Sequence, residues 1–333
     1  MLHFLRNDEV YPYFWQRRVQ DEAPAPFTFL DLNALKASWL ASKQGSDQKL
    51  EAQLYGSKEK PHYSGWTMKR LETTLAQSGY EPPKQLWATE NLISVVAKPG
   101  RWGFSERRGA ASWRRGQRIW SWRKGLRSKA GELRSRFEAL RHPTNLSGDD
   151  LWLNLGAGAE NYPAYIKVDI AGAQDVYDNI VALSKIADAS VAKIYCNHVL
   201  EHIPVELLPV MLNRWREVLK PGGVVTARMP DAKQALLSLN EKWVETNEQE
   251  LARLDLPNFL ERESSREGVL DDDSCIQSIY GWSNSTPHSW DEPNQHKSLW
   301  TPLLARERFE AAGFKVEVAE NLGTLNTVIV ARK

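Results

Sequence analysis

Apolar residues in the second half of the chain recur with the periods of strands and helices. Short apolar runs predict strands over 151–155, 166–168, 191–195 and 224–229. Each run is too short for a helix and is flanked by turn-forming residues, which favours strands. The longest apolar-periodic segment lies between the last two strands, where a parallel sheet needs a crossover.

Helical spacing is clearest in that crossover. Its apolar positions are Val210, Leu212, Trp215, Val218 and Leu219. The sequence Lys-Pro-Gly-Gly at 220–223 should end the helix, since glycine and proline interrupt helices. A polar helical region is expected over 231–262 and a last helix over 303–312. Strands alternating with helices predict an α/β fold with a mainly parallel sheet.

The first of these strands runs into a tight glycine turn. Gly156-Ala157-Gly158 follows Leu155 directly, and the next short strand ends on Asp169. Glycine lets the backbone approach a ligand closely because it has no Cβ atom. A buried strand, a glycine turn and an acid at the tip of the next strand indicate a nucleotide-cofactor pocket. The alternative is a turn that merely closes the strand.

The spacing of this turn argues against a dinucleotide. A dinucleotide fingerprint has three glycines and an acid about 20 residues further on. Here Asn161 takes the third glycine position, and Asp169 follows Gly156 by only 13 residues. The crossover is too short for a full helix, so a pyrophosphate would lack the helix N-terminus that stabilises it. S-adenosylmethionine carries no phosphate and needs only the turn and the acid.

The segments downstream of the turn identify a family resemblance. Residues 196–203 read CNHVLEHI, and 219–223 read LKPGG. Together with the strand and its glycine turn, this ordered set resembles the class I S-adenosylmethionine-dependent methyltransferases, most closely the type 11 group. The resemblance covers about 148–333 and implies a doubly wound, Rossmann-like methyltransferase sheet. It also implies S-adenosylmethionine as the cofactor.

The resemblance assigns cofactor roles to a set of positions. Gly156 and Gly158 would shape the methionine side, Asp169 would hold the ribose, and either Asp178 or Asn179 would contact the adenine. The helix after the turn is abbreviated, and Asn179 stands where the family usually has an Asp. The full predicted cofactor set is Asn154, Gly156, Ala157, Gly158, Asp169, Ile170, Asp178, Asn179, Asn197 and His198.

Candidate catalytic residues lie where strands end. Methyl transfer to a hydroxyl needs a base that removes the proton. The candidates are His198, His202, Asp231 and His296, with Glu201 between the first two. Packing or capping is the alternative for the histidines, and a helix N-cap is the alternative for Asp231. The segment reads HVLEH rather than HEXXH and shows no third ligand, so we predict no metal site.

An aromatic and polar segment, PHSWDEPNQHKSLWT at 287–301, is the expected acceptor-binding insertion. His296 and Lys297 are its first candidates, followed by His288, Trp290 and Asp291. Aromatic rings beside hydrogen-bonding groups suit a sugar or a planar ring. An ordered surface loop is the alternative interpretation.

The first hundred residues resemble the end of the chain. The short matches occur in the same order: Asp31 with Asp231, 54–56 with 279–281, 65–67 with 299–301, and 91–99 with 326–333. We therefore predict that residues 1–100 are a partial repeat, equivalent to the C-terminal half of a second methyltransferase domain. This repeat lacks a glycine turn and cannot form a cofactor site. Since half a sheet exposes an edge, it should pack on the complete domain or on another chain. The alternative is a remnant with poor order.

A basic segment separates the repeat from the complete domain, and we take 101–147 as a helical linker. Residues 101–141 carry a net charge of +10, which leaves −9 for the rest of the chain. Leu126, Ala130, Leu133, Phe137 and Leu140 share one helical face. The segment suits a linker helix, an anchor on an anionic membrane surface, or a polyanion-binding site. Nucleic acid ranks last, because no nucleic-acid-binding fold motif accompanies the charge.

Composition, charge and cysteine pattern limit where in the cell we expect the protein. The 333 residues have a net charge of +1, and no apolar run reaches the roughly 18 residues of a membrane span. Charge within the first eight residues argues against a secretory signal. Cys196 and Cys275 form no C-x-x-C pair, which favours a reducing cytoplasm. Peripheral membrane attachment is the second localisation considered.

These observations lead to two hypotheses. The first is a methyltransferase, acting as a monomer or a homo-oligomer, that moves a methyl group to a hydroxyl of a small-molecule or saccharide acceptor. The second is a non-catalytic methyltransferase-like module that its basic segment recruits to a partner or membrane. The abbreviated crossover and Asn179 motivate the second hypothesis.

Overall fold

The computed structural model describes residues 25–42, 46–56, 65–77, 84–89, 92–97, 146, 148, 150–170, 172–244, 267–270, 272–281, 295–321 and 325–333. The chain forms two compact units. The small unit comprises Met1–Arg123, Ala235–Glu241 and Val269–Gln295, and the large unit comprises Lys124–Gln234, Lys242–Gly268 and His296–Lys333. The predicted division into 1–100, 101–147 and 148–333 stays a prediction.

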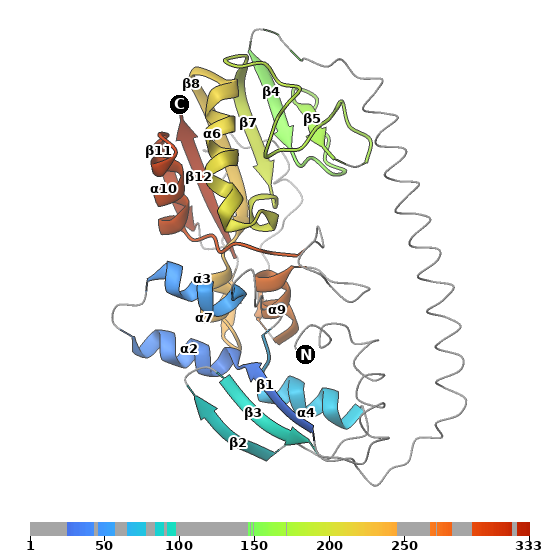
Figure 1. Ribbon diagram of the computed structural model, residues 1–333, viewed down its shortest axis with the longest axis vertical. Coiled ribbons are helices and arrows are strands. Elements are labelled where there is room, and N and C mark those ends of the chain that lie inside the picture. The colour runs from blue at the N-terminus through green and yellow to red at the C-terminus, as the bar shows by residue number, and fades with distance from the viewer. Residues whose placement is uncertain are drawn as a thin grey trace, which may run out of the picture. The chain divides into compact units, whose positions relative to one another are not determined.

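The large unit is built on a seven-stranded sheet (Figure 1). Its strands are β4 (Leu151–Leu155), β5 (Ile166–Asp169), β6 (Val176–Tyr177), β7 (Val191–Asn197), β8 (Leu219–Pro230), β11 (Lys315–Asn321) and β12 (Asn326–Arg332). The order is β11-β12-β8-β7-β4-β5-β6. From β8 to β6 the strands are parallel, whereas β12 and β11 pair antiparallel. The predicted doubly wound, Rossmann-like sheet is confirmed.

The winding reverses direction beside β4. The chain leaves β4 for β5 and β6 on one side, then crosses to β7 and β8 on the other. In open sheets of this kind, the crevice at the carboxyl ends of the strands on either side of the reversal is the usual ligand site. The loops after β4 and β7 are therefore the place to look for a site.

One face of the sheet carries the hydrophobic core. Leu153, Ile194 and Val225 are 0–1 % exposed and pack with Trp215 of α6 (Leu208–Val218) and Phe309 of α10 (Pro302–Ala311). The Trp215 indole N–H donates to the Ile180 carbonyl at 2.8 Å, so the buried ring leaves no unmet donor. Both helices agree with the predicted ranges to within two residues.

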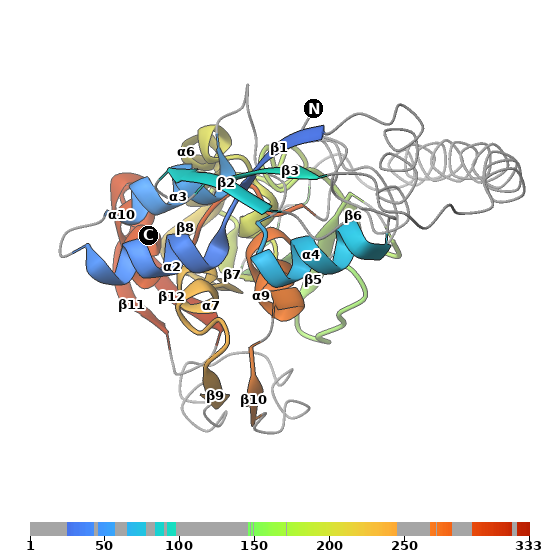
Figure 2. The same cartoon turned by 90° about the horizontal axis from the view of Figure 1, so that it is seen from below.

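The predicted polar helix over 231–262 is wrong for the residues that the structure describes. Helix α7 covers only Ala232–Leu237, and β9 (Lys242–Val244) follows it. Asn240 adopts φ +60°, which a helix cannot accommodate, and its N–H donates to the Leu270 carbonyl at 2.7 Å. β9 pairs with β10 (Glu267–Val269), and the two strands lie side by side in Figure 2. Pairing with a distant segment thus ends the helix.

The small unit contains a three-stranded antiparallel sheet. It is formed by β1 (Ala25–Leu30), β2 (Lys84–Thr89) and β3 (Leu92–Ala97) in the order β1-β3-β2. Between β1 and β2 lie α2 (Leu32–Ala41), α3 (Asp47–Tyr55) and α4 (Met68–Gln77), and α9 (Asp272–Tyr280) belongs to the same unit. The order and pairing sense match those of β8, β12 and β11, where the last strand also inserts beside the first.

Local details of the small unit match those of the large unit. Asp31 caps α2 and forms a parallel bridge with Trp66, as Asp231 caps α7 and forms a parallel bridge with Trp300. Thr67 accepts from the Arg70 N–H at 3.2 Å, as Thr301 accepts from the Leu304 N–H at 3.2 Å. The two segments therefore use the same helix-start chemistry at equivalent positions.

Candidate functional site

The glycine turn stands at the carboxyl end of β4. The Gly156 N–H donates to the Val168 carbonyl at 2.8 Å, which joins the turn to β5. Gly156 has φ +68° and Gly158 has φ +51°, a region that side-chain-bearing residues rarely adopt. A Cβ atom at Gly156 would lie 2.4 Å from Val199 Cγ2, whereas one at Gly158 would meet nothing within 4 Å. Space for a ligand thus opens at Gly158, and Gly156 accommodates the loop after β7.

Asp169 closes the turn from the end of β5. Its carboxylate accepts from the Gly158 N–H at 2.9 Å and from the Ile170 N–H at 2.6 Å. The Ile170 side chain beside it is 58 % exposed. A carboxylate next to an exposed apolar side chain suits a nucleoside, with the acid for ribose hydroxyls and the apolar group for the base.

The side chains of Asp178 and Asn179 differ in how accessible they are to a ligand. Asp178 is buried, and its carboxylate accepts from the Asn179 N–H, the Ser184 hydroxyl and the Lys185 N–H at 2.7–3.0 Å. It thereby holds its own loop together. Asn179 is exposed, although its Oδ1 accepts from the Val181 N–H at 2.9 Å. Asn179 is therefore the more accessible of the two predicted adenine contacts.

Aromatic rings cover the crossover between β4 and β5. The described part of this crossover has no helix, as its length predicted. Tyr162 lies edge-on to Tyr195 with ring centroids 5.5 Å apart, and Tyr165 lies 5.5 Å from Trp152. These contacts fix a loop that has no helical hydrogen bonds of its own.

Two predicted cofactor residues lie near the carboxyl ends of β4 and β7. Asn154 is fully buried in β4, and neither atom of its amide has a hydrogen-bond partner among the described residues. Asn197, at the end of β7, donates its Nδ2–H to Glu160 Oε1 at 2.9 Å. The contact between Asn197 and Glu160 joins the loop after β4 to the end of β7.

A buried acid surrounded by imidazoles follows β7. Glu201 lies in the short 3-10 helix η2 (Leu200–His202) and its side chain is 2 % exposed. Its Oε1 lies 3.3 Å from His198 Nδ1, 3.8 Å from His202 Nε2 and 4.0 Å from His296 Nε2. Burial raises the pKa of the Glu201 carboxyl, but the three imidazoles outweigh burial and bring the pKa to about 2. We call Glu201 and these three residues the histidine cluster.

Backbone hydrogen bonds hold the two parts of the histidine cluster together. The N–H groups of Lys297 and Ser298 donate to the Glu201 carbonyl at 2.6 and 3.2 Å. The Ser298 hydroxyl donates to the Leu200 carbonyl at 3.1 Å. His296 is thereby fixed beside η2, although it lies far from η2 in the sequence. His198, His202 and His296 are thus brought together around Glu201.

Asp231 has a different environment. Its carboxylate accepts from the Gln234 N–H, Asn321 Nδ2 and the Thr327 hydroxyl at 2.9–3.2 Å. Burial raises its pKa, and these hydrogen bonds only partly counter that effect. Of the two predicted roles, the structure shows the N-cap. His288, Trp290 and Asp291 lie outside the described residues.

Sequence reasoning missed the central position of Glu201. The sequence showed an acid between two histidines, which is also common on solvated surfaces. Only the return of residues 296–298 to η2 buries this carboxylate. The available signal in the sequence was His296, which precedes Leu299-Trp300-Thr301 by three residues, as His62 precedes Gly65-Trp66-Thr67.

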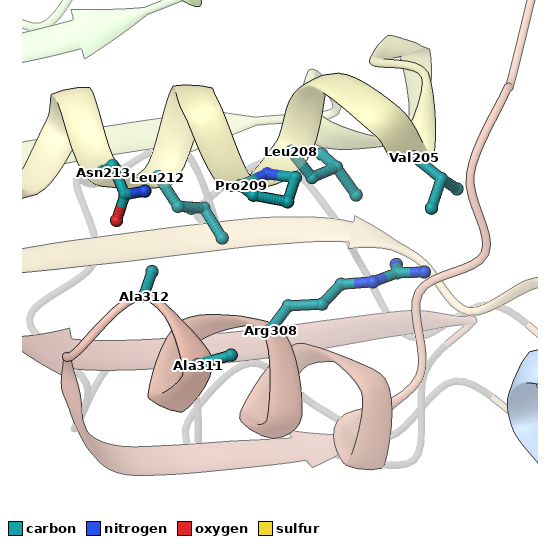
Figure 3. A pocket seen from close by; sticks show the side chains of 8 residues that line it. All are labelled: Val205, Leu208, Pro209, Leu212, Asn213, Arg308, Ala311 and Ala312. Atoms are coloured by element: carbon teal, nitrogen blue, oxygen red, sulfur yellow. The ribbon is translucent and has the colours of Figure 1, made fainter.

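An apolar groove lies elsewhere on the large unit, between α6 and α10 (Figure 3). Its walls include Leu208, Pro209 and Leu212 from α6, with Arg308 and Ala311 from α10. None of the predicted site residues lines it. The candidate site remains the carboxyl edge of the sheet, where the contact between Gly156 and Val199 joins the glycine turn to the histidine cluster.

Comparison with known proteins gave structural likenesses only. No family model matches the sequence, and no curated protein matches it. A methyltransferase from Mesorhizobium loti is 12 % identical over 60 % of this chain and 98 % of its own, with a TM-score of 0.33. The 1,6-didemethyltoxoflavin-N1-methyltransferase of Burkholderia thailandensis is 15 % identical over 75 % of this chain and 98 % of its own, with a TM-score of 0.33.

A third likeness is a methyltransferase from Archaeoglobus fulgidus, 15 % identical over 62 % of this chain and 94 % of its own, with a TM-score of 0.32. The assignment of the site rests on the sheet topology and side-chain geometry given above. Within the part of the chain that the structure describes, no helix has the length and apolar character needed to cross a bilayer.

Proposed function

We propose that the chain is a methyltransferase that uses S-adenosylmethionine. The observation that carries the proposal is the joining of two loops at the reversal point of the sheet. The glycine turn with Asp169 lies after β4, the histidine cluster lies after β7, and Val199 packs against Gly156 between them. A cofactor site and an acceptor site must adjoin for a group to pass directly between them.

The residues present fit this cofactor. The crossover after Gly158 has no helix, so the turn offers no helix N-terminus for a phosphate. Asp169 is placed to hold ribose hydroxyls, and Ile170 supplies apolar surface beside it. S-adenosylmethionine, when bound, supplies an activated methyl group on sulfur.

The acceptor in this proposal is a hydroxyl of a small molecule or saccharide. Removal of a hydroxyl proton needs a nearby basic group, and His198, His202 and His296 gather at the acceptor side of the turn. His198 has the most exposed side chain of the three, at 42 %, and is the first candidate to contact the acceptor. Asp231 is omitted from this role because it caps α7.

Calorimetry with S-adenosylmethionine tests the cofactor assignment. We expect saturable heat with the intact protein, and Asp169→Ala should weaken binding by roughly 1–3 kcal/mol through lost hydrogen bonds to ribose. Glu206→Ala, a change at an exposed carboxyl after the histidine cluster, is the matched control and should leave affinity unchanged. An affinity that Asp169→Ala does not alter would show that the site is misplaced.

A non-catalytic module is the second candidate. It is favoured by the hydrogen bonds that Asp169 and Asp178 accept within their own loops, which leave each carboxylate fewer acceptor sites for a ligand. Folded protein that gives no heat at millimolar S-adenosylmethionine would select this candidate. Formation of S-adenosylhomocysteine in the presence of saccharide acceptors would select the methyltransferase.

The basic segment 101–141 remains a proposed contact for an anionic membrane surface or another polyanion, in a cytoplasmic protein. Its residues lie outside the described part of the chain. Cosedimentation with anionic vesicles is the test, and binding should fall as salt rises. Absence of salt-sensitive binding would leave the role of a linker.

A further inference from the structure

The Glu201 carboxylate is a buried charge with imidazoles around one of its oxygens. Both of its oxygens are enclosed, and neither has a hydrogen bond of normal geometry to a described residue. An isolated carboxylate in such a place is costly unless a cation or several donors accompany it. The residues around it are therefore the first place to look for a bound cation.

Two of the imidazole nitrogens approach one oxygen of this carboxylate at distances longer than hydrogen bonds. His202 Nε2 and His296 Nε2 lie 3.8 and 4.0 Å from Glu201 Oε1. Two ligands that each stand about 2.0–2.2 Å from one metal ion are separated by roughly 3–4 Å, depending on the angle at the metal. Both distances from Glu201 Oε1 fall at the upper end of that range, as expected for ligands of a shared ion.

The arrangement of these ligands is built into the fold. The ligand atoms of Glu201, His202 and His296 all lie within 4.8 Å of one another. The hydrogen bonds from Lys297 and Ser298 to the Glu201 carbonyl hold the two segments in register. Glu201 and His296 are buried, while the His202 side chain is 27 % exposed, so one side of the group is open to solvent.

We propose that Glu201, His202 and His296 bind one divalent transition-metal ion, with zinc as the best match. Two imidazoles and one carboxylate suit zinc and its neighbours, whereas magnesium and calcium prefer all-oxygen sites. Three protein ligands leave a position for a further ligand, as in catalytic zinc sites. The sequence argued against a metal because no third ligand was evident, and His296 is that ligand.

The role of the ion deepens the proposed methyltransferase function and rests on it, although binding of the ion does not. An ion here would polarise an acceptor hydroxyl and ease loss of its proton. His198, 3.3 Å from Glu201 and the most exposed of the imidazoles, would then stand beside the acceptor rather than bind the ion.

Metal binding can be measured on the untagged full chain after chelator treatment. Titration with Co²⁺ should give visible d–d absorption that saturates at one ion per chain, and Zn²⁺ should displace it. His202→Ala and His296→Ala should each weaken Zn²⁺ binding by at least 10-fold. His62→Ala, a histidine outside the described residues, is the control and should bind as the unchanged protein does. Circular dichroism of each variant checks folding.

Two results would overturn the metal proposal. One is the absence of Co²⁺ absorption in folded protein, and the other is equal Zn²⁺ affinity of His202→Ala, His296→Ala and His62→Ala. Calorimetry with S-adenosylmethionine on the same metal-free protein separates the two proposals. Cofactor binding without metal binding refutes only the ion, and metal binding without cofactor binding refutes only the methyltransferase.

A second inference comes from a reciprocal pair of hydrogen bonds inside the small unit. The Tyr55 hydroxyl donates to the Ile279 carbonyl at 2.7 Å, and the Tyr280 hydroxyl donates to the Leu54 carbonyl at 2.9 Å. Each tyrosine ends its helix, α3 or α9, and bonds the residue that precedes the other tyrosine. Their rings meet edge-on with centroids 5.8 Å apart. Such reciprocity is the mark of two-fold symmetric contact.

Other details follow the same relation. Gly56 and Gly281, the residues after the two tyrosines, have φ +71° and +87°. Thr67, which caps α4, also hydrogen-bonds to Asp272 at the start of α9. These contacts relate α3 and α9 to one another within the small unit.

We infer that α3 and α9 pair through a local two-fold inside the small unit, so that Tyr55 and Tyr280 stabilise the pair equally. Tyr55→Phe and Tyr280→Phe should lower the urea midpoint of unfolding by similar amounts, and more than Tyr177→Phe at an exposed hydrogen bond. Unequal effects of the two substitutions would refute the symmetry.

Discussion

Replacement of Gly156 by alanine should destabilise the protein in a way that a matched change at Gly158 does not. Both glycines have positive φ, so alanine at either position costs about 1–2 kcal/mol of backbone strain. At Gly156 the new methyl group would also lie 2.4 Å from Val199 Cγ2, and crowding of a packed site costs about 1–3 kcal/mol. Gly158 adds nothing to its strain, because its Cβ would meet no atom within 4 Å.

We therefore expect Gly156→Ala to lower the free energy of unfolding by about 2–5 kcal/mol and Gly158→Ala by about 1–2 kcal/mol. Equilibrium urea unfolding, followed by circular dichroism, measures both changes. Adding Val199→Ala removes the crowding atoms, so its effect should be non-additive with Gly156→Ala by about 1–3 kcal/mol and additive with Gly158→Ala. Equal losses at the two glycines, or additivity in both pairs, would refute the proposed contact between the glycine turn and the loop after β7.

Three further outcomes follow from buried polar groups. Asp178→Ala should cost about 1–3 kcal/mol in urea unfolding, because three donors lose their shared acceptor, and a loss no larger than that of Glu206→Ala would contradict this. Trp215→Phe should cost about 1–3 kcal/mol in the same assay, because the buried Ile180 carbonyl loses its donor, and a neutral change would count against that bond. Asp231 has a raised pKa in the folded state, so the folded protein binds its proton more tightly than the unfolded chain. The stability of the native protein relative to Asp231→Asn should therefore be greatest at low pH, and should fall as pH rises from the ordinary aspartate pKa of 3.8 through the raised pKa. Unfolding curves at several pH values check this, and a constant difference would refute it.

The elements of the large unit were predictable where a single periodicity governs them. The apolar spacing of 210–219 predicted α6, and the short runs at 151–155 and 191–195 predicted β4 and β7. The region after Asp231 was not predictable in the same way. Its polar composition suits a helix, but the helix ends because Asn240 and Leu239 pair with Leu270, a contact between distant segments.

The candidate site also has a part that local sequence predicted and a part that depends on contact between distant segments. The glycine turn and Asp169 are close in sequence, so their spacing alone suggested a shared role, and the hydrogen bond from the Gly158 N–H joins them. The histidine cluster depends on residues 296–298 returning to η2. The residues that neighbour Glu201 in the sequence do not indicate this contact with 296–298. The burial of Glu201 could therefore not be predicted from them.

The crossover after Gly158 bears on how the proposed site would distinguish S-adenosylmethionine from the product that remains after methyl transfer. A helix at this position would place about half a positive charge at its N-terminus. That charge would repel a sulfonium and favour the neutral thioether that remains after transfer. Here the crossover has no helix, and its tyrosine rings pack against Tyr195 and Trp152. If S-adenosylmethionine binds at the proposed site, it would meet no helix N-terminus, and this source of preference for the neutral product would be absent.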